Sequence, residues 1–172
     1  LLNVGGHVTL HVGYSGEGYL DILDGGTVFS QTASIGSTAG SLGVATVGEG
    51  GTWINDGTLS IGRNGQGELR IEGGGQVTSG GNTAYIGYGP GSQGTVIVTG
   101  EGSSWNLGGD LYVGGNSEGA AGLGSLFVNN DGLVTVWGEM YVWETGLVGG
   151  DGTITVMVPT TLHNYGTIAP GD

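Results

Sequence analysis

The sequence predicts an all-β fold, a right-handed parallel β-helix (β-solenoid) of about six to seven three-stranded coils. Three observations predict it. Short apolar runs alternate with polar residues at a period of two, as in strands, and no stretch has helical spacing. Glycine accounts for 43 of the 172 residues and interrupts these runs at regular intervals. A β-branched residue followed by glycine recurs about every 25 residues, which is typical of a solenoid. The right hand is the strong default for crossovers between parallel strands.

The recurring mark sets the register of the coils. It stands at Val12-Gly13, Ile35-Gly36, Ile61-Gly62, Ile86-Gly87 and Val113-Gly114, with Val142-Trp143 as an altered sixth copy. Two types of coil alternate, so we interpret residues 1–172 as one domain built of two-coil repeats, 12–60, 61–112 and 113–172. The last repeat diverges, because it holds an insertion within 116–122 and Trp143 replaces the marking glycine. Neither end has the features of a natural terminus, so we expect a piece of a longer repeat protein.

Each strand is expected to have one dry face. In 68–72 the alternation puts Leu69 and Ile71 on one side and three charged residues on the other. Coils stacked at ~4.8 Å pair each strand with its equivalents above and below, and glycines take the corners. The interior is then filled by three apolar columns: Leu20/Ile22, Leu69/Ile71, Val96/Val98 and Leu126/Val128; Val28, Trp53, Val77, Trp105 and Val134; and Ala33/Ile35, Leu59/Ile61, Ala84/Ile86, Leu111/Val113 and Met140/Val142.

Composition excludes several classes of partner. The chain has 15 acidic residues against two cations, Arg63 and Arg70, which gives a net charge of -13. Such a field repels phosphate backbones, so we expect no nucleic-acid binding. No apolar run is long enough for a transmembrane helix, so we expect no membrane span in this segment. The absence of cysteine fits an exported protein but fits many others too.

The repeat units resemble a known family. Residues 12–28 and 61–77 share the pattern (V/I)GxxGxGxLxIxxGGxV, and residues 86–105 read IGxxxGSxGxVxVxGxGSxW, a unit that 35–53 follows with one residue missing. These units look like the repeats of type V secretion autotransporter passengers and PEP-CTERM-associated surface proteins of Gram-negative bacteria. The tail 149–172 is similar to the closing unit of autotransporter passenger repeats. The resemblance implies an extracellular or outer-membrane-surface right-handed β-helix, exported and without known catalytic residues.

The residues themselves predict no catalytic or cofactor-binding site. His7 and His11 lie on one face of an expected strand but ~13 Å apart, too far to share a metal. Glu68 and Glu72 have the same separation, which exceeds that of glycosidase carboxylate pairs within one strand. Enzymes on parallel β-helices that cut acidic polysaccharides would need cations to bind that substrate, and this chain offers two arginines. We therefore expect no enzyme.

Acidic turns leave calcium as the one metal to consider. Asp56, Asp110, Asp131 and Asp151 fall in or beside glycine turns, as does Glu118, and calcium prefers oxygen ligands. The calcium-binding nonapeptide of β-rolls is absent, although 149–152 comes near it. Solvation of the turns is the favoured interpretation, so we expect no cofactor and no metal, with calcium at these turns as the alternative.

One concentrated aromatic group stands out, formed by Trp137, Tyr141, Trp143 and Tyr165. It is interpreted either as a contact surface on which glycans stack or, with more weight, as a cover for the end of the hydrophobic columns.

Three functions from different classes follow. The first is a non-enzymatic structural or adhesive module of a cell-surface protein, whose partners would be neighbouring repeats, host or environmental surfaces, or glycans. The second is a building block of an extracellular fibre in which open coil ends pair end to end, because a solenoid end is an unpaired β edge. The third, a polysaccharide-active enzyme, is the least favoured.

Overall fold

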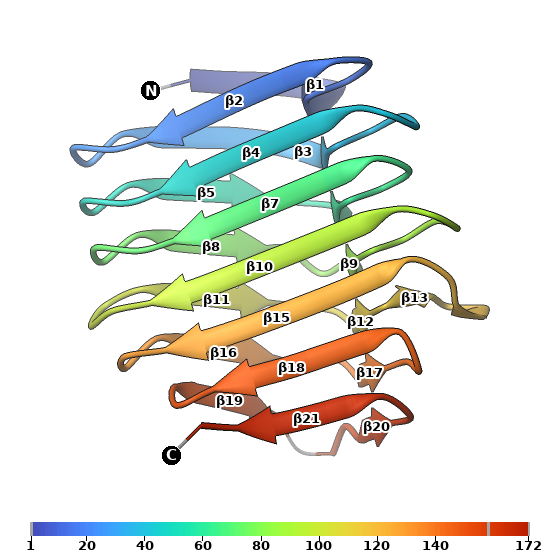
Figure 1. Ribbon diagram of the computed structural model, residues 1–172. Helices are drawn as coiled ribbons and strands as arrows, with labels where there is room; N and C mark the ends of the chain where they lie inside the picture. The colour runs from blue at the N-terminus through green and yellow to red at the C-terminus, as the bar shows by residue number, and fades with distance from the viewer. Residues whose placement is uncertain (1, 158, 172) are drawn as a thin grey trace.

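The chain folds into a stack of short strands in the computed structural model, which describes residues 2–157 and 159–171 (Figure 1). No helix occurs among these residues, and the strands of successive coils pair in parallel. This confirms the predicted parallel β-solenoid. The strands nearest the viewer in Figure 1 run from right to left, the chain returns behind them, and each pass lies below the previous one, so the coil is right-handed.

Three rows of strands make up the coil. Face 1 is a seven-stranded sheet of β2 (Glu17–Ile22), β4 (Leu42–Val47), β7 (Gln66–Ile71), β10 (Gln93–Thr99), β15 (Leu123–Asn129), β18 (Gly146–Gly150) and β21 (Thr167–Pro170). Face 2 contains β5 (Thr52–Asn55), β8 (Gln76–Ser79), β11 (Ser104–Leu107), β16 (Leu133–Val136) and β19 (Thr153–Val156). Face 3 contains β6 (Leu59–Ile61), β9 (Ala84–Ile86), β12 (Leu111–Val113), β17 (Met140–Val142) and β20 (Leu162–Asn164).

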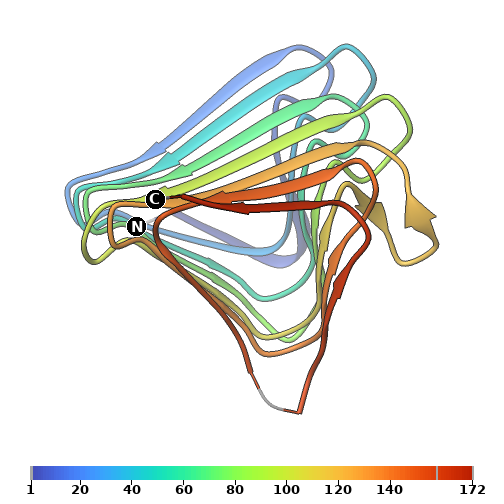
Figure 2. The ribbon, with the colours of Figure 1, turned by 60° about the horizontal axis from the view of Figure 1, so that its bottom comes forward.

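Faces 2 and 3 belong to one sheet, because two long strands near the N-terminus span both rows. These are β1 (Leu2–Val12) and β3 (Thr27–Ile35), and β3 pairs with β5 through its first half and with β6 through its second. Seen obliquely along the stack, the coils form a roughly triangular outline (Figure 2).

The interior consists of the predicted columns. On face 1 the register aligns Ala45 with Leu69, Leu69 with Val96, and Val96 with Leu126. On face 2 the two tryptophans, Trp53 and Trp105, alternate with valines, and both are fully buried. The columns are dry through the middle of the stack, whereas Leu20 and Ile168 at its two ends are half-buried. All three predicted columns are therefore confirmed.

A buried polar column runs beside the tryptophans on face 2. Ser30, Asn55 and Ser79 point inward two residues after the apolar column, and each is buried. Trp53 Nε1 donates to Ser30 Oγ at 3.0 Å, and Trp105 Nε1 donates to Ser79 Oγ at the same distance. Each indole N–H thus has a partner in the neighbouring coil, which removes the penalty for burying it.

The glycine at each repeat mark is required by both conformation and space. Gly62 and Gly87 have φ of +67° and +75°, in the left-handed region that side chains rarely adopt. A Cβ on Gly62 would lie 2.1 Å from the carbonyl oxygen of Gln93, which is on the next coil. The corner therefore lets the backbones of successive coils approach closely enough to pair.

The predicted insertion forms a small hairpin. β13 (Gly115–Asn116) and β14 (Gly119–Ala120) pair antiparallel, the one antiparallel pair among the described strands. Figure 2 shows this hairpin projecting from the corner of the triangle. The rest of the coil keeps its register, since β10 and β15 pair without a break across it.

Candidate functional surface

The outward side of face 3 carries one continuous line of side chains. Register places one residue from each coil in this line: His11, Ser34, Ser60, Tyr85, Tyr112, Tyr141 and His163. Each is the middle residue between two inward-facing positions, so strand alternation turns it outward. We call this line the outer ladder of face 3.

The C-terminal half of the outer ladder is an aromatic stack. Ring centroids lie 5.5 Å apart for Tyr85 and Tyr112, 4.8 Å for Tyr112 and Tyr141, and 4.4 Å for Tyr141 and His163, with interplanar angles of 20°, 6° and 8°. The spacing follows the ~4.8 Å between paired strands, which suits parallel ring stacking. Tyr112 and Tyr141 therefore have a stacked ring on both sides, whereas Tyr85 at the N-terminal end of the stack has one on the side of Tyr112 alone.

A second, shorter stack lies beside the first. Trp143 stacks on Tyr141 at 5.6 Å and on Tyr165 at 5.1 Å. Its Nε1 donates to the carbonyl oxygen of Asn116 in the hairpin at 3.0 Å. Trp143 thus links the hairpin to the outer ladder at the corner where earlier coils have glycine.

The carboxylate of Glu139 lies close to the polar tips of two rings at the C-terminal end of the ladder, Tyr141 and His163. The hydroxyl of Tyr141 donates a hydrogen bond to its carboxylate, and His163 Nε2 lies 3.5 Å from the same carboxylate. The hydrogen bond to Glu139, with a smaller contribution from desolvation, raises the pKa of Tyr141 to about 12. Tyr141 therefore stays protonated through the neutral range and acts as a donor.

The predicted aromatic group is only partly brought together. Tyr141, Trp143 and Tyr165 are joined by stacking, whereas Trp137 is 57% exposed and makes no ring contact with the other three. The interpretation that the group covers the column end is wrong, because none of its members lines that end. Tyr141 lies between the inward Met140 and Val142, so alternation directs it outside.

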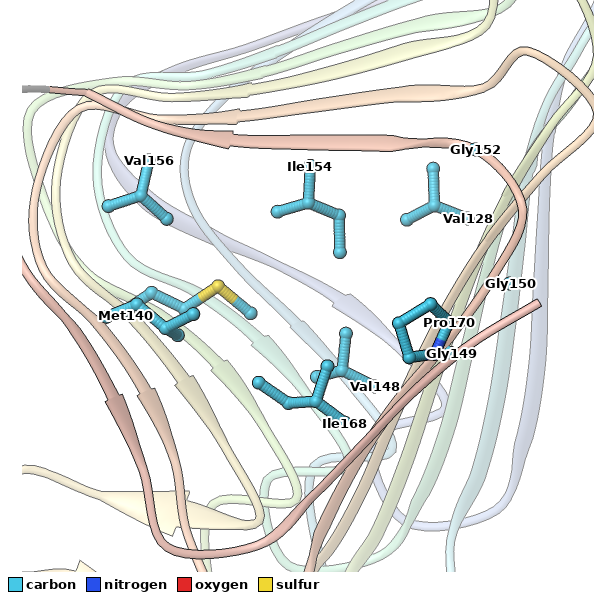
Figure 3. A pocket seen from close by; sticks show the side chains of 11 residues that line it. Val128, Met140, Val148, Gly149, Gly150, Gly152, Ile154, Val156, Ile168 and Pro170 are labelled. Carbon is cyan, nitrogen blue, oxygen red and sulfur yellow. The ribbon is translucent and has the colours of Figure 1, made fainter. Parts of the chain in front are cut away.

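The end of the columns is an open aliphatic hollow instead. It measures about 240 Å³ and is walled by Met140, Ile154, Val156 and Ile168, with Pro170 at its edge. Figure 3 shows these side chains around a common space. Ile154, Val156 and Ile168 are half-buried here, where no further coil among the described residues covers them. The residues that pair with them one coil earlier are buried: Val134, Val136 and Val148.

The four calcium candidates lie in separate turns. Asp110 Oδ1 accepts from the backbone N–H of Glu139 at 2.9 Å, and Asp151 Oδ1 accepts from that of Asn130 at 2.8 Å. Asp56 and Asp131 are exposed, and Asp131 adopts φ of +65°. In the part of the chain that the structure describes, no three acidic or histidine side chains come together as a metal-binding group. Calcium at these turns therefore remains a prediction.

The other candidates take ordinary roles at the surface. His11 Nδ1 lies 2.8 Å from Ser37 Oγ, and the side chain of His7 lies outside the described residues. Glu68 forms an ion pair with Arg70 on the outside of β7, so this arginine is engaged locally. Arg63 lies in the turn after β6, and no carboxylate among the described residues pairs with it.

A polar hollow lies where the aromatic stack stops. It measures about 330 Å³ and is lined by Tyr85 and Tyr88, by Ser34 and Ser60 of the outer ladder, and by Arg63. A second hollow of about 430 Å³ adjoins it, because both share Thr9, Thr32 and Thr58. Sequence reasoning named Arg63 as a cation but did not single out Tyr85, Tyr88, Ser34 or Ser60. The signal was present as the middle residue of each face 3 strand, which changes from Ser to Tyr between Ser60 and Tyr85.

Comparisons with known proteins give no further guide: no family model, curated protein or solved structure matches the chain. Among the described residues, none belongs to a helix with the length and apolar character needed to cross a membrane.

Proposed function

We propose that this chain is a non-enzymatic structural or adhesive β-solenoid of an exported bacterial protein, displayed at the cell surface or released outside the cell. The observation that carries the proposal is the continuous strand pairing along the stack, with one register shift between β1 and β3. Face 1 pairs continuously from β2 to β21, and faces 2 and 3 pair from β1 and β3 to β19 and β20. Each strand is held by its neighbours over a dry core, which makes the stack a stiff rod with a long, repetitive outer surface.

Charge and repeat type support the same proposal. A net charge of -13 keeps such rods apart in solution and fits a solvated surface protein. The repeat units resemble those of autotransporter passengers and PEP-CTERM-associated surface proteins, which supports export. The two arginines lie in different settings, Arg70 paired with Glu68 and Arg63 in a turn, so they offer no joint clamp for an acidic substrate.

Labelling of the source cells tests this proposal. An antibody raised against residues 12–112 should bind intact cells, or material shed from them, as strongly as permeabilised cells. Protease added to intact cells should remove the signal. Labelling that appears only after permeabilisation would contradict export and display.

A second function, a fibre built end to end, is favoured by the open aliphatic hollow. Ile154, Val156 and Ile168 are only half-buried there, and β19, β20 and β21 expose unpaired edges. Burying this surface against the N-terminal edge of a second copy, or against a neighbouring coil, would gain ~25 cal/mol per Å² of apolar area. Electron microscopy of the purified protein separates the two functions, because a fibre shows threads far longer than one stack.

A further inference from the structure

We propose that the polar hollow between Ser34, Ser60, Tyr85 and Arg63 binds a neutral saccharide. The inference rests on the adhesive form of the proposed function and gives it a ligand class. It concerns a different place from Tyr141, Trp143 and Tyr165, which stack on one another.

The hollow exists because the outer ladder changes size at one point. Tyr85 is covered by Tyr112 on the side of the next coil, but its partner on the other side is Ser60, which is too small to stack on it. Ser34 occupies the same position one coil before Ser60, towards the N-terminus. Two coils therefore lack an aromatic rung, and the space is left open along the outside of face 3.

An aromatic corner closes one end of this space. Tyr85 and Tyr88 both line it, and their rings meet at 82° with centroids 4.9 Å apart. A pyranose ring carries weakly positive C–H groups on its faces and hydroxyl groups around its edge. The electron-rich face of an aromatic ring attracts such C–H groups, so this corner suits a sugar ring better than a flexible apolar chain.

The floor of the hollow offers hydrogen bonds that the protein does not use. Ser60 is 6% exposed and lines the hollow, so its hydroxyl is presented to a ligand there. Ser34 is 2% exposed and accepts a hydrogen bond from Ser37, which leaves its own proton free to donate.

On one side of the hollow, the guanidinium of Arg63 adds several hydrogen-bond donors. Arg63 lines it, and no ion pair engages this guanidinium among the described residues. The adjoining hollow continues past Thr32 and Thr58 to Gln31, Asp56 and Asn82. Hydroxyl, amide and carboxylate groups in a row match the alternating donors and acceptors of a saccharide longer than one unit.

Charge selects a neutral saccharide over an acidic one. The net charge of -13 repels anions over the whole surface, and one arginine cannot reverse that field. Asp56, at the far end of the adjoining hollow, would repel the carboxylate of an acidic saccharide bound there. The two hollows, about 330 and 430 Å³, have the volume of small-ligand sites, but their polar lining suits hydroxyl groups.

The test is binding of defined neutral oligosaccharides of glucose, galactose, mannose and N-acetylglucosamine, screened on an array and measured by calorimetry. Two variants change the hollow in opposite ways. Tyr85→Ser removes the aromatic wall by placing there the residue that Ser60 and Ser34 already provide in the preceding coils. Ser60→Tyr adds a rung and fills the space. The matched control is Tyr141→Ser, the same substitution on the same ladder but away from the hollow.

We expect at least one neutral oligosaccharide to bind, Kd to rise about tenfold or more in each hollow variant, and Kd to stay within about threefold in the control. Ser60→Tyr keeps the test decisive if removal of Tyr85 weakens the fold. The proposal is overturned if no neutral saccharide binds, if only uronate-containing saccharides bind, if Tyr85→Ser and Tyr141→Ser act equally, or if Ser60→Tyr leaves binding unchanged. Surface labelling is independent of all these results, so the structural function stands or fails separately.

Discussion

Replacing Ile71 with Asp should unfold the centre of the stack, because this residue lies in the middle of the face 1 column. Ile71 is fully buried and pairs with Val47 on one side and Val98 on the other. Truncating a buried isoleucine costs ~2–5 kcal/mol, and burying an unpaired carboxylate adds several kcal/mol more. That sum rivals the ~5–15 kcal/mol that holds an ordinary domain together. Coils depend on their neighbours, so the damage should spread beyond β7.

The control is Arg70→Asp, one residue away on the outside of the same strand. Its side chain is 45% exposed and pairs with Glu68, and exposed pairs contribute ~0–1 kcal/mol. Urea titration followed by tryptophan fluorescence measures both variants, because Trp53 and Trp105 are buried on either side of this coil. Without urea, Ile71→Asp should emit at longer wavelength than the native protein because Trp53 and Trp105 become exposed in addition to Trp137, and Arg70→Asp should unfold near the native midpoint. Equal losses in both variants would refute the register.

Three further predictions follow from the same geometry. The pKa of Tyr141 is raised from 10.0 to about 12, so the stability gained from its hydrogen bond to Glu139 is intact below pH 10 and lost as pH rises towards 12. In Tyr141→Phe the melting temperature should fall less between pH 10 and pH 12 than in the native protein. The same fall in both proteins would contradict the contact. The protein should associate end to end as salt or added calcium screens its charge repulsion, which light scattering measures. The rise should be smaller for Ile168→Asp, which alters the aliphatic hollow, than for the outward Thr167→Asp. A strict monomer at every condition would rule out end-to-end contact. The protein should cleave no plant or bacterial polysaccharide, either by hydrolysis or by β-elimination. Cleavage that is abolished by substituting one carboxylate residue would show that the protein is an enzyme.

The columns and corners could be predicted from the sequence because both depend on local rules. Alternation decides which residues point inward, and stacking repeats those decisions about every 25 residues, so one strand such as 68–72 sets the register of face 1. Gly62 and Gly87 occupy corners for a reason that also holds residue by residue. The hairpin at 115–120 shows the limit, because the insertion was visible in the sequence but its antiparallel pairing was not.

The outer surface was harder to predict, because it depends on neighbours from different coils. Trp137 is close to Tyr141 in sequence but lies outside the stack, whereas Tyr112, 29 residues before Tyr141, is its direct partner. Sequence proximity was thus the wrong measure, and register was the right one. The buried Ser79 was missed for a related reason, since alternation from Val77 turns it inward but its indole partner, Trp105, comes from the next coil.

We propose that the protein acts as a rod at the cell surface and not as a catalyst. The direct measurement is attachment of source cells to a surface, plotted against the number of copies displayed and repeated after protease has removed the protein from intact cells. We predict that attachment rises in proportion to the copies displayed and disappears with the protein. Attachment that a few copies saturate, or that persists after the protein has been removed, would contradict the claim.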